Sequence, residues 1–166
     1  MGSVSQHQRI VVQIARRFKD IDFSQPRLKR LVRGVCTRFR LPRATVSIAV
    51  VDNAEIRAVN KRFLNRGHST DCLSFDLSDD EAPDPPLGSR LLEVVVNGQK
   101  AVKEASVRGH SSEAELALYV THGLLHKLGF DDSTEQKAKR MHRLEDEILR
   151  QFGYGLLYDS RGGQES

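Results

Sequence analysis

The sequence predicts one α+β domain in which a mostly parallel four-stranded sheet packs against about five helices. The chain has 166 residues, a length typical of a single domain. It contains no internal repeat and no linker that would divide it. Its hydrophobic periodicity gives the element order β-α-β-α-β-β-α-α-α, which favours a layered α+β arrangement. We expect the domain to span residues 1–158, and the polar, glycine-containing residues 159–166 to form a disordered tail.

Four elements are expected in the first half of the chain. Apolar β-branched runs predict strands, whereas apolar residues at helical spacing predict helices. Ser24 precedes the first helix as a capping residue, and Asp52 with Glu55 forms a capping box at the start of the second. The expected strands are residues 9–16 and 44–51, and the expected helices are residues 26–40 and 53–64.

The second half begins with two strands, residues 71–76 and 91–96, separated by an acidic, proline-rich loop at residues 79–88. Three helices follow, over residues 98–107, 112–128 and 133–152. Asn97 is expected to cap the first of them. Ser112 with Glu115 is expected to begin the second as a capping box, and Gly129 to end it in a left-handed conformation.

Basic residues are unevenly distributed, although the net charge is only +4. Residues 24–51 contain seven arginines and lysines and no acidic residue, and a second basic group follows in residues 57–66. Such segregation favours a polyanion as partner, and a solvated helix face is the alternative. The candidates for contacts with such a polyanion are Arg27, Arg30, Arg33, Arg38, Lys61 and Arg62.

The composition argues against a membrane protein and against a secreted one. No apolar run approaches the ~18 residues that a membrane span needs, and the N-terminus lacks the apolar core of a secretory signal. Two cysteines, Cys36 and Cys72, are too few for a disulfide framework. We expect inert thiols, a cytoplasmic location and no membrane partner.

The segment from His122 to Asp132 carries the clearest functional signal. His122 and His126 lie four residues apart on an expected helix, so both side chains project from one face. Gly129 then turns the chain and can return Asp132 toward the two imidazoles. Two histidines and one carboxylate leave a coordination position open for water, as in catalytic zinc sites. We therefore expect one divalent metal ion, with zinc favoured.

Other interpretations of this segment stay open. Asp131 and His142 are alternatives to Asp132 as the third ligand, and two histidines can share a helix face by chance. Zinc peptidases of the metzincin type have the same histidine spacing, but they carry a glutamate directly after the first histidine as general base. Gly123 occupies that position here and cannot move a proton, which argues against a peptidase.

Two separate blocks of the sequence match one family. Residues 122–132 read HGLLHKLGFDD, and residues 69–75 read STDCLSF. They resemble the signatures His-Gly-x-Leu-His-x-x-Gly-Tyr-Asp-His and Pro-Thr-Asn/Asp-x-Leu-Ser-Phe of the YbeY family of bacterial rRNA maturation factors, which are single-domain metal-dependent endoribonucleases. Residues 55–60 and 93–98 also look like family positions. The resemblance covers roughly residues 44–150.

The resemblance implies a single-strand-specific endoribonuclease that acts in rRNA maturation, at the 3′ end of small-subunit rRNA, and in ribosome quality control. The implied partners are single-stranded RNA, rRNA and the small ribosomal subunit, and no DNA is expected. Three positions depart from the family pattern: Asp132 replaces the usual third histidine, Ser69 replaces the proline, and Leu64 stands where the family places a functionally important arginine. Arg66 or Arg62 is a candidate to replace that arginine.

Catalytic roles beyond metal binding fall to three candidates. Arg66 is expected to offset charge that develops on the phosphate, and Asp131 and His68 are candidates for the general base. With Asp132 in place of a neutral histidine, the formal charge of the metal site falls by one, which predicts weaker zinc selectivity and better acceptance of manganese. A non-catalytic ribosome-associated factor with a structural metal is the main alternative, and Leu64 favours it.

Overall fold

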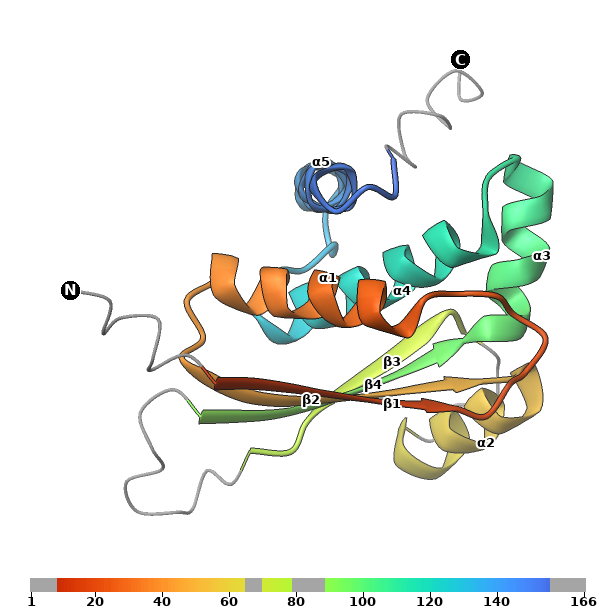
Figure 1. Cartoon of the computed structure of the whole chain (residues 1–166), viewed down its shortest axis with the longest axis horizontal. Helices are drawn as coiled ribbons and strands as arrows, with labels where there is room; N and C mark the ends of the chain where they lie inside the picture. The colour runs from red at the N-terminus through yellow and green to blue at the C-terminus, as the bar shows by residue number, and fades with distance from the viewer. Residues whose placement is uncertain (1–8, 65–69, 79–88, 156–166) are drawn as a thin grey trace.

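The computed structural model describes residues 9–64, 70–78 and 89–155. Within these residues the chain forms four strands and five helices in the predicted order (Figure 1). The elements are β1 (Arg9–Arg16), α1 (Gln25–Arg38), β2 (Arg43–Val51), α2 (Asn53–Leu64), β3 (Cys72–Asp76), β4 (Ser89–Asn97), α3 (Gly98–Arg108), α4 (Ser112–Lys127) and α5 (Glu135–Gln151). The predicted tail and the proline-rich loop lie outside the described residues.

The four strands form one mixed sheet in the order β1-β2-β4-β3. β1 and β4 both pair with β2 in parallel, whereas the short β3 runs antiparallel along β4 and forms an edge of the sheet. The register places Ile48 beside Ile14 on one side and beside Val94 on the other. Paired residues of β1, β2 and β4 therefore point their side chains to the same face of the sheet. This confirms the predicted mostly parallel sheet.

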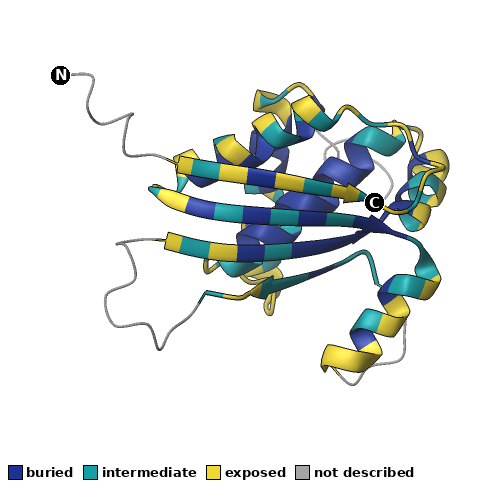
Figure 2. Ribbon diagram, turned by 60° about the horizontal axis from the view of Figure 1, so that its bottom comes forward, coloured by how far each residue is buried: buried dark blue, intermediate teal, exposed yellow. Residues whose placement is uncertain are grey.

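Helices cover the two faces of the sheet unequally. α1 and α4 lie on one face, α5 lies beyond them, and α2 is the only described helix that packs against the other face (Figure 1). Among the described residues, α2 covers only one end of this second face (Figure 2). α4 contacts α1, α3, α5, β3 and β4, so most of its residues are buried. The helix that carries the two histidines is thus the most enclosed helix of the fold.

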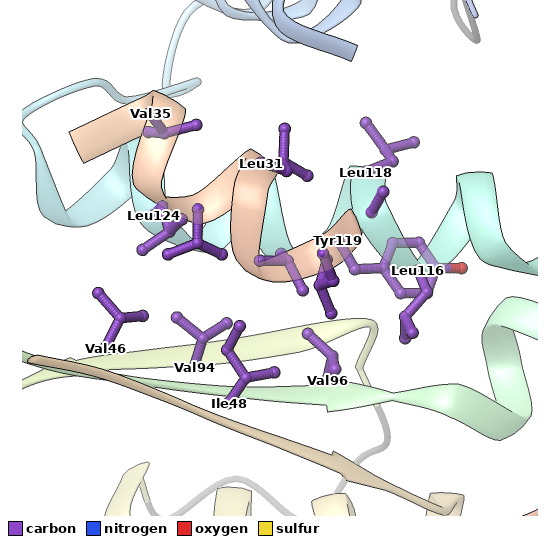
Figure 3. Packing of buried hydrophobic residues seen from close by; sticks show 14 of the residues in the cluster. Leu31, Val35, Val46, Ile48, Val94, Val96, Leu116, Leu118, Tyr119 and Leu124 are labelled. Atoms are coloured by element: carbon purple, nitrogen blue, oxygen red, sulfur yellow. The ribbon is translucent and has the colours of Figure 1, made fainter. Parts of the chain in front are cut away.

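The main core lies between the sheet and the layer formed by α1 and α4 (Figure 3). Each large aliphatic side chain buried there stabilises the fold by roughly 1.5–3 kcal/mol, and together they hold α4 against the sheet. The labelled core residues are Leu31, Val35, Val46, Ile48, Val94, Val96, Leu116, Leu118, Tyr119 and Leu124. A smaller cluster on the opposite face, Val51, Ile56, Leu73 and Val95, fixes α2.

Local capping explains where the first three helices begin. The side chains of Ser24, Asp52 and Asn97 accept backbone N–H bonds in the first turns of α1, α2 and α3, as predicted. Each of these bonds satisfies a donor that has no partner within its helix. Gly129, with φ of 103°, follows the end of α4 in the predicted left-handed conformation.

α4 begins at Ser112 as predicted, but its capping residue was predicted wrongly, and the predicted start of the last helix is wrong by two residues. Ser111, and not Ser112, caps α4, because its hydroxyl accepts an N–H bond of the first turn at 3.0 Å. α5 begins at Glu135 with Thr134 as its cap, instead of at Ser133. Both segments offer neighbouring hydroxyl residues, so the sequence alone leaves the choice between them open.

Glu115, predicted to complete the capping box with Ser112, is fully buried instead. Its carboxylate accepts a bond from Arg108 at 2.8 Å and lies 2.5 Å from Nε2 of His110. These contacts join the end of α3 to α4 and keep the buried charge paired.

Among the described residues, no helix has the length and apolarity that crossing a membrane requires. Cys36 and Cys72 are both free thiols. Burial raises the pKa of Cys36 to about 11 and raises that of Cys72 well above its ordinary value. Cys36 is buried and Cys72 is half-buried, and a raised pKa lowers the reactivity of a thiol, as expected for both.

Candidate metal centre

The predicted metal ligands converge at the end of α4. Nε2 of His122 and Nε2 of His126 are 2.9 Å apart, and Oδ2 of Asp132 lies 3.7 Å from the first and 3.9 Å from the second. In a tetrahedral zinc site with bonds of about 2.05 Å, neighbouring ligand atoms are about 3.4 Å apart. Small side-chain rotations therefore suffice to place all three atoms around one ion. Of the described His, Cys, Asp and Glu residues, only these three form such a group.

The turn after α4 brings Asp132 back toward the histidines. The backbone N–H of Phe130 donates to the carbonyl of Leu125 at 3.0 Å, which closes the helix around Gly129. The Phe130 ring packs against the core and meets the Phe39 ring edge-on, with centroids 5.3 Å apart. Gly129 supplies the backbone conformation of the turn, and Phe130 anchors the loop to the core. Together these two residues position Asp132.

A buried carboxylate supports the first histidine from behind. Oε2 of Glu145, on α5, lies 2.7 Å from Nδ1 of His122, and Glu145 is 0% exposed. Because a carboxylate accepts a hydrogen bond, this contact favours the tautomer of His122 with the proton on Nδ1. The lone pair of Nε2 then points at the candidate metal position, an arrangement typical of metal-binding histidines.

The protonation of His122 reflects two opposing effects. Burial disfavours the imidazolium and lowers the pKa, whereas the hydrogen bond and the charge of Glu145 raise it, and the net pKa of His122 lies above its ordinary value. A metal ion occupies the same lone pair as a proton, so a site that favours the proton at Nε2 through negative charge also favours a cation there. Sequence reasoning missed Glu145, because it lies 23 residues from His122 on another helix.

Gly123 faces the sheet and not the metal position. A Cβ atom at this residue would lie 3.0 Å from Cγ1 of Val94 and 3.6 Å from both Sγ of Cys72 and Cβ of Ser74. The glycine therefore allows α4 to approach β3 and β4 closely. A glutamate at this position would point into that contact, so the geometry itself is incompatible with the peptidase arrangement considered above.

The carboxylate of Asp131 is occupied by contacts with Ser133 and Lys137. Its Oδ1 accepts bonds from the backbone N–H of Ser133 at 3.1 Å and from the hydroxyl of the same residue at 2.7 Å, and Oδ2 lies 3.5 Å from Nζ of Lys137. These bonds hold the pKa of Asp131 below its ordinary value. The group that can hold a metal thus contains Asp132 and, within the described residues, neither Asp131 nor His142. A catalytic role for Asp131 stays a prediction.

The remaining predicted catalytic residues, Arg66 and His68, lie outside the described residues. Leu64, at the last position of α2, is exposed. Arg62 is also exposed, and its guanidinium lies over the Phe63 ring, 5.3 Å from the centroid. The choice between Arg66 and Arg62 as replacement for the family arginine therefore stays open.

The predicted RNA-binding residues do not form one surface. Lys61 and Arg62 belong to α2, whereas Arg27, Arg30, Arg33 and Arg38 belong to α1 on the other face of the sheet (Figure 1). Arg30, Arg33 and Arg38 line a hollow of about 450 Å³ beside the end of α5. Two basic regions on opposite faces are compatible with separate contacts to one long RNA, but not with one continuous groove.

Arg27 has a structural environment that the sequence did not predict. Its guanidinium pairs with Glu113 at 2.8 Å, donates to the carbonyl of Gly153, and lies over the Tyr154 ring at 4.1 Å from the centroid. The side chain thus connects α1 to the start of α4 and to the segment after α5. These three contacts leave it poorly placed for phosphate.

Lys137 and Arg140 were not among the predicted site residues. With Gly129, Phe130, Asp131 and Met141 they line a hollow of about 300 Å³ beside the loop that leads to Asp132. Both cations are exposed on the first turns of α5. A cationic side chain next to a metal site is a natural contact for a phosphate group. The sequence carries no signal for this placement, because α5 has the pattern of an ordinary amphipathic helix.

Comparison with known proteins identifies the relatives of the chain. A family model described as endoribonuclease YbeY matches residues 13–153. A protein named endoribonuclease YbeY from Ureaplasma parvum is 36% identical over 147 residues, which cover 88% of this chain and 92% of the relative. One of the same name from Alkaliphilus metalliredigens is 32% identical over 145 residues, covering 84% of this chain and 94% of the relative.

A solved structure shows the same fold. The solution structure of a Thermotoga maritima protein has a TM-score of 0.54 to this chain at 20% sequence identity, covering 94% of this chain and 97% of the other. At this identity the match supports the arrangement of helices and strands alone.

Proposed function

The chain belongs to the YbeY family, and we propose that it is a metal-dependent, single-strand-specific endoribonuclease that acts in rRNA maturation. The observation that carries this proposal is the convergence of His122, His126 and Asp132 within 4.8 Å of one another, with Glu145 bonded behind the first histidine. Three ligands and a supported imidazole are what a catalytic metal site requires.

The donor set fits a divalent ion, and zinc is the ion we propose. Two imidazole nitrogens and one carboxylate oxygen are common zinc ligands, and three protein ligands leave a position for water or for a phosphoryl oxygen. When bound, such an ion polarises a phosphoryl oxygen or lowers the pKa of a coordinated water. The side chain of Asp132 is 43% exposed, so substrate can reach this side of the site from solvent.

Residues around the proposed site hold the metal ligands in position and offer positive charge to RNA phosphates. Glu145 orients His122, and Gly129 and Phe130 position Asp132, so two of the three ligands are held by bonds outside the site. Lys137 and Arg140 are suited to contact RNA phosphates beside the metal, and Arg66 is proposed to offset charge in the transition state. Affinity that rests on such cations should fall as salt concentration rises.

The proposed biological substrate is the 3′ end of small-subunit rRNA, with the small ribosomal subunit as partner and the cytoplasm as location. A role in ribosome quality control is part of the same proposal, as is a preference for RNA over DNA. Family membership supports these proposals, since the related proteins carry the name endoribonuclease YbeY. The distribution of basic residues on both faces is consistent with a large RNA partner.

A second candidate function is a non-catalytic, metal-containing factor that binds the ribosome. Leu64 favours this alternative, because the family places a functionally important arginine at that position. A metallopeptidase is disfavoured, since Gly123 packs against β4 and offers no general base.

Cleavage of a short single-stranded RNA by the purified full chain tests the proposal. We expect turnover that requires added zinc or manganese and that is lost in the folded double variant His122→Ala with His126→Ala. Turnover that survives in the double variant would indicate a contaminating nuclease and would contradict the assignment. Tight RNA binding with stoichiometric metal and no turnover would favour the non-catalytic factor.

A further inference from the structure

The face of the sheet that packs against α2 contains a pocket that the proposed reaction does not use. It has a volume of about 310 Å³, and its apolar walls come from α2 and from strands β2, β3 and β4. This face is the one turned away from α1 and α4 (Figure 2). The lining consists of Arg17, Ala49, Val51, Glu55, Val59, Phe63, Phe75, Leu77, Glu93 and Val95.

Two aromatic rings, those of Phe63 and Phe75, form part of the pocket wall. Phe63, near the end of α2, meets Phe75 of β3 edge-on, with ring centroids 5.7 Å apart. Phe63 is 60% exposed, although it is one of the largest apolar residues of the chain. An aromatic side chain left open to solvent at the rim of a pocket is a suitable platform for another flat ring.

The charges around the pocket favour a nucleic acid strand over an apolar ligand. The last turn of α2 presents Lys61 and Arg62, both exposed, and the only acidic residue of that helix, Glu55, is paired with Arg17. The exposed Phe63 ring therefore shares the last turn of α2 with two cations, one of which, Arg62, lies over the ring at 5.3 Å from its centroid. Single-stranded RNA combines a polyanionic backbone with bases that stack on aromatic side chains, which matches this combination of features.

We propose that this pocket binds a base of the single-stranded RNA substrate, stacked on Phe63, while Lys61 and Arg62 contact the adjoining phosphates. This inference rests on the proposed RNA-cleaving function. The two sites lie on opposite faces of the sheet next to its edge strand, since Cys72 and Ser74 of β3 lie beside α4 whereas Phe75 faces the pocket. A strand held at the pocket passes round the β3 edge to reach the metal centre.

A carboxylate in the pocket sets a preference among bases. Glu93, on β4, is half-buried and takes part in no ion pair within the described part of the chain. Carboxylate oxygens accept hydrogen bonds only, so they match bases with an amino group, such as cytosine, better than uracil. The pocket should therefore bind cytosine more tightly than uracil, and Glu93→Gln should reduce this difference.

Equilibrium binding to full-length protein without added metal tests the proposal, because binding is then separated from cleavage. The probes are an oligocytidine of about ten nucleotides and an abasic ribose–phosphate strand of equal length. Phe63→Ala should weaken oligocytidine binding by roughly 5- to 100-fold and leave the abasic strand unaffected, because stacking on one aromatic ring has this magnitude. Phe63→Tyr should restore binding, and Val107→Ala, an exposed residue of α3, should leave it unchanged.

The outcomes distinguish this inference from the function on which it rests. If wild type cleaves RNA but Phe63→Ala binds oligocytidine as tightly as wild type, the pocket inference is wrong and the nuclease assignment stands. If Phe63→Ala instead abolishes a concentration-dependent dimer without changing RNA affinity, the pocket is a self-association surface and the inference is equally wrong. If wild type neither binds nor cleaves RNA, both proposals fail together.

Discussion

Replacement of Glu145 by glutamine tests whether the carboxylate behind His122 strengthens metal binding. The glutamine would keep the size of the side chain but lose the charge that faces Nδ1 of His122 across 2.7 Å. Partners of metal-binding histidines contribute about 10- to 100-fold to metal affinity, which corresponds to about 1.4–2.7 kcal/mol. Because Glu145 is fully buried, solvent does not screen this contact. We expect Glu145→Gln to weaken zinc binding by that factor.

Competition with a chromogenic zinc chelator measures this affinity directly. Glu147→Gln is the matched control, because Glu147 lies on the same helix, is 52% exposed and pairs with Arg38 instead of a metal ligand. The two variants make the same chemical change two residues apart. Circular dichroism and thermal unfolding without metal show whether Glu145→Gln is folded at the assay temperature.

The result that would refute this reasoning is equal zinc affinity of wild type and a folded Glu145→Gln variant. The bond between Glu145 and His122 would then be a packing detail without influence on the ion. A loss of the same size in Glu147→Gln would also refute it, because the effect would then follow from general charge and not from the hydrogen bond.

Three further predictions concern Asp132, Gly123 and Cys36. Asp132→His should raise the ratio of zinc to manganese affinity, since an imidazole replaces a hard oxygen ligand, and an unchanged ratio in paired titrations would count against Asp132 as a ligand. Gly123→Glu should lower the unfolding free energy by several kcal/mol, measured by urea titration, because its side chain enters the contact with Val94, whereas Val107→Glu should have little effect. Burial raises the pKa of Cys36 from its ordinary value of 9.0 to about 11, so its contribution to stability is complete below about pH 9 and is lost as pH rises toward 11. Cys36→Ala should therefore lose less unfolding free energy than wild type between about pH 8 and pH 10, by roughly 1 kcal/mol, and identical losses would contradict the assigned pKa.

Local sequence signals predicted the parts of the site that are local in the chain. The spacing of His122 and His126 defines one helix face, and Gly129 has a backbone conformation that few other residues adopt. Both features depend on interactions within about one turn of helix. The position of Asp132 follows from the same turn, so the structure brings the predicted ligands together.

Features that depend on contacts between distant segments were not predictable from the sequence. In the sequence, Glu145 is one of several acids on an amphipathic helix, and only the packing of α5 on α4 places it behind His122. Arg27 belongs to a basic run, but Glu113 and Tyr154 from other parts of the chain occupy its side chain. The amino-acid type alone does not distinguish such pairs from solvated charges.

In the sheet, too, the sequence predicted the local elements but not the contacts between distant segments. Short apolar, β-branched runs identified all four strands and the element order, because strand formation leaves a local pattern. The strand order β1-β2-β4-β3, with β4 between β2 and β3, depends on pairing across the sheet. This order creates the pocket beside Phe63, which no local pattern could have predicted.

The most direct test of the central claim is to titrate metal-free protein with zinc while measuring RNA cleavage in the same sample. If His122, His126 and Asp132 hold one catalytic ion, the rate should rise with added zinc and reach a plateau at one equivalent per chain. Asp132→Ala should require more zinc to reach any plateau. A rate that does not depend on added metal, or a plateau that persists when both histidines are replaced by alanine, would contradict the account.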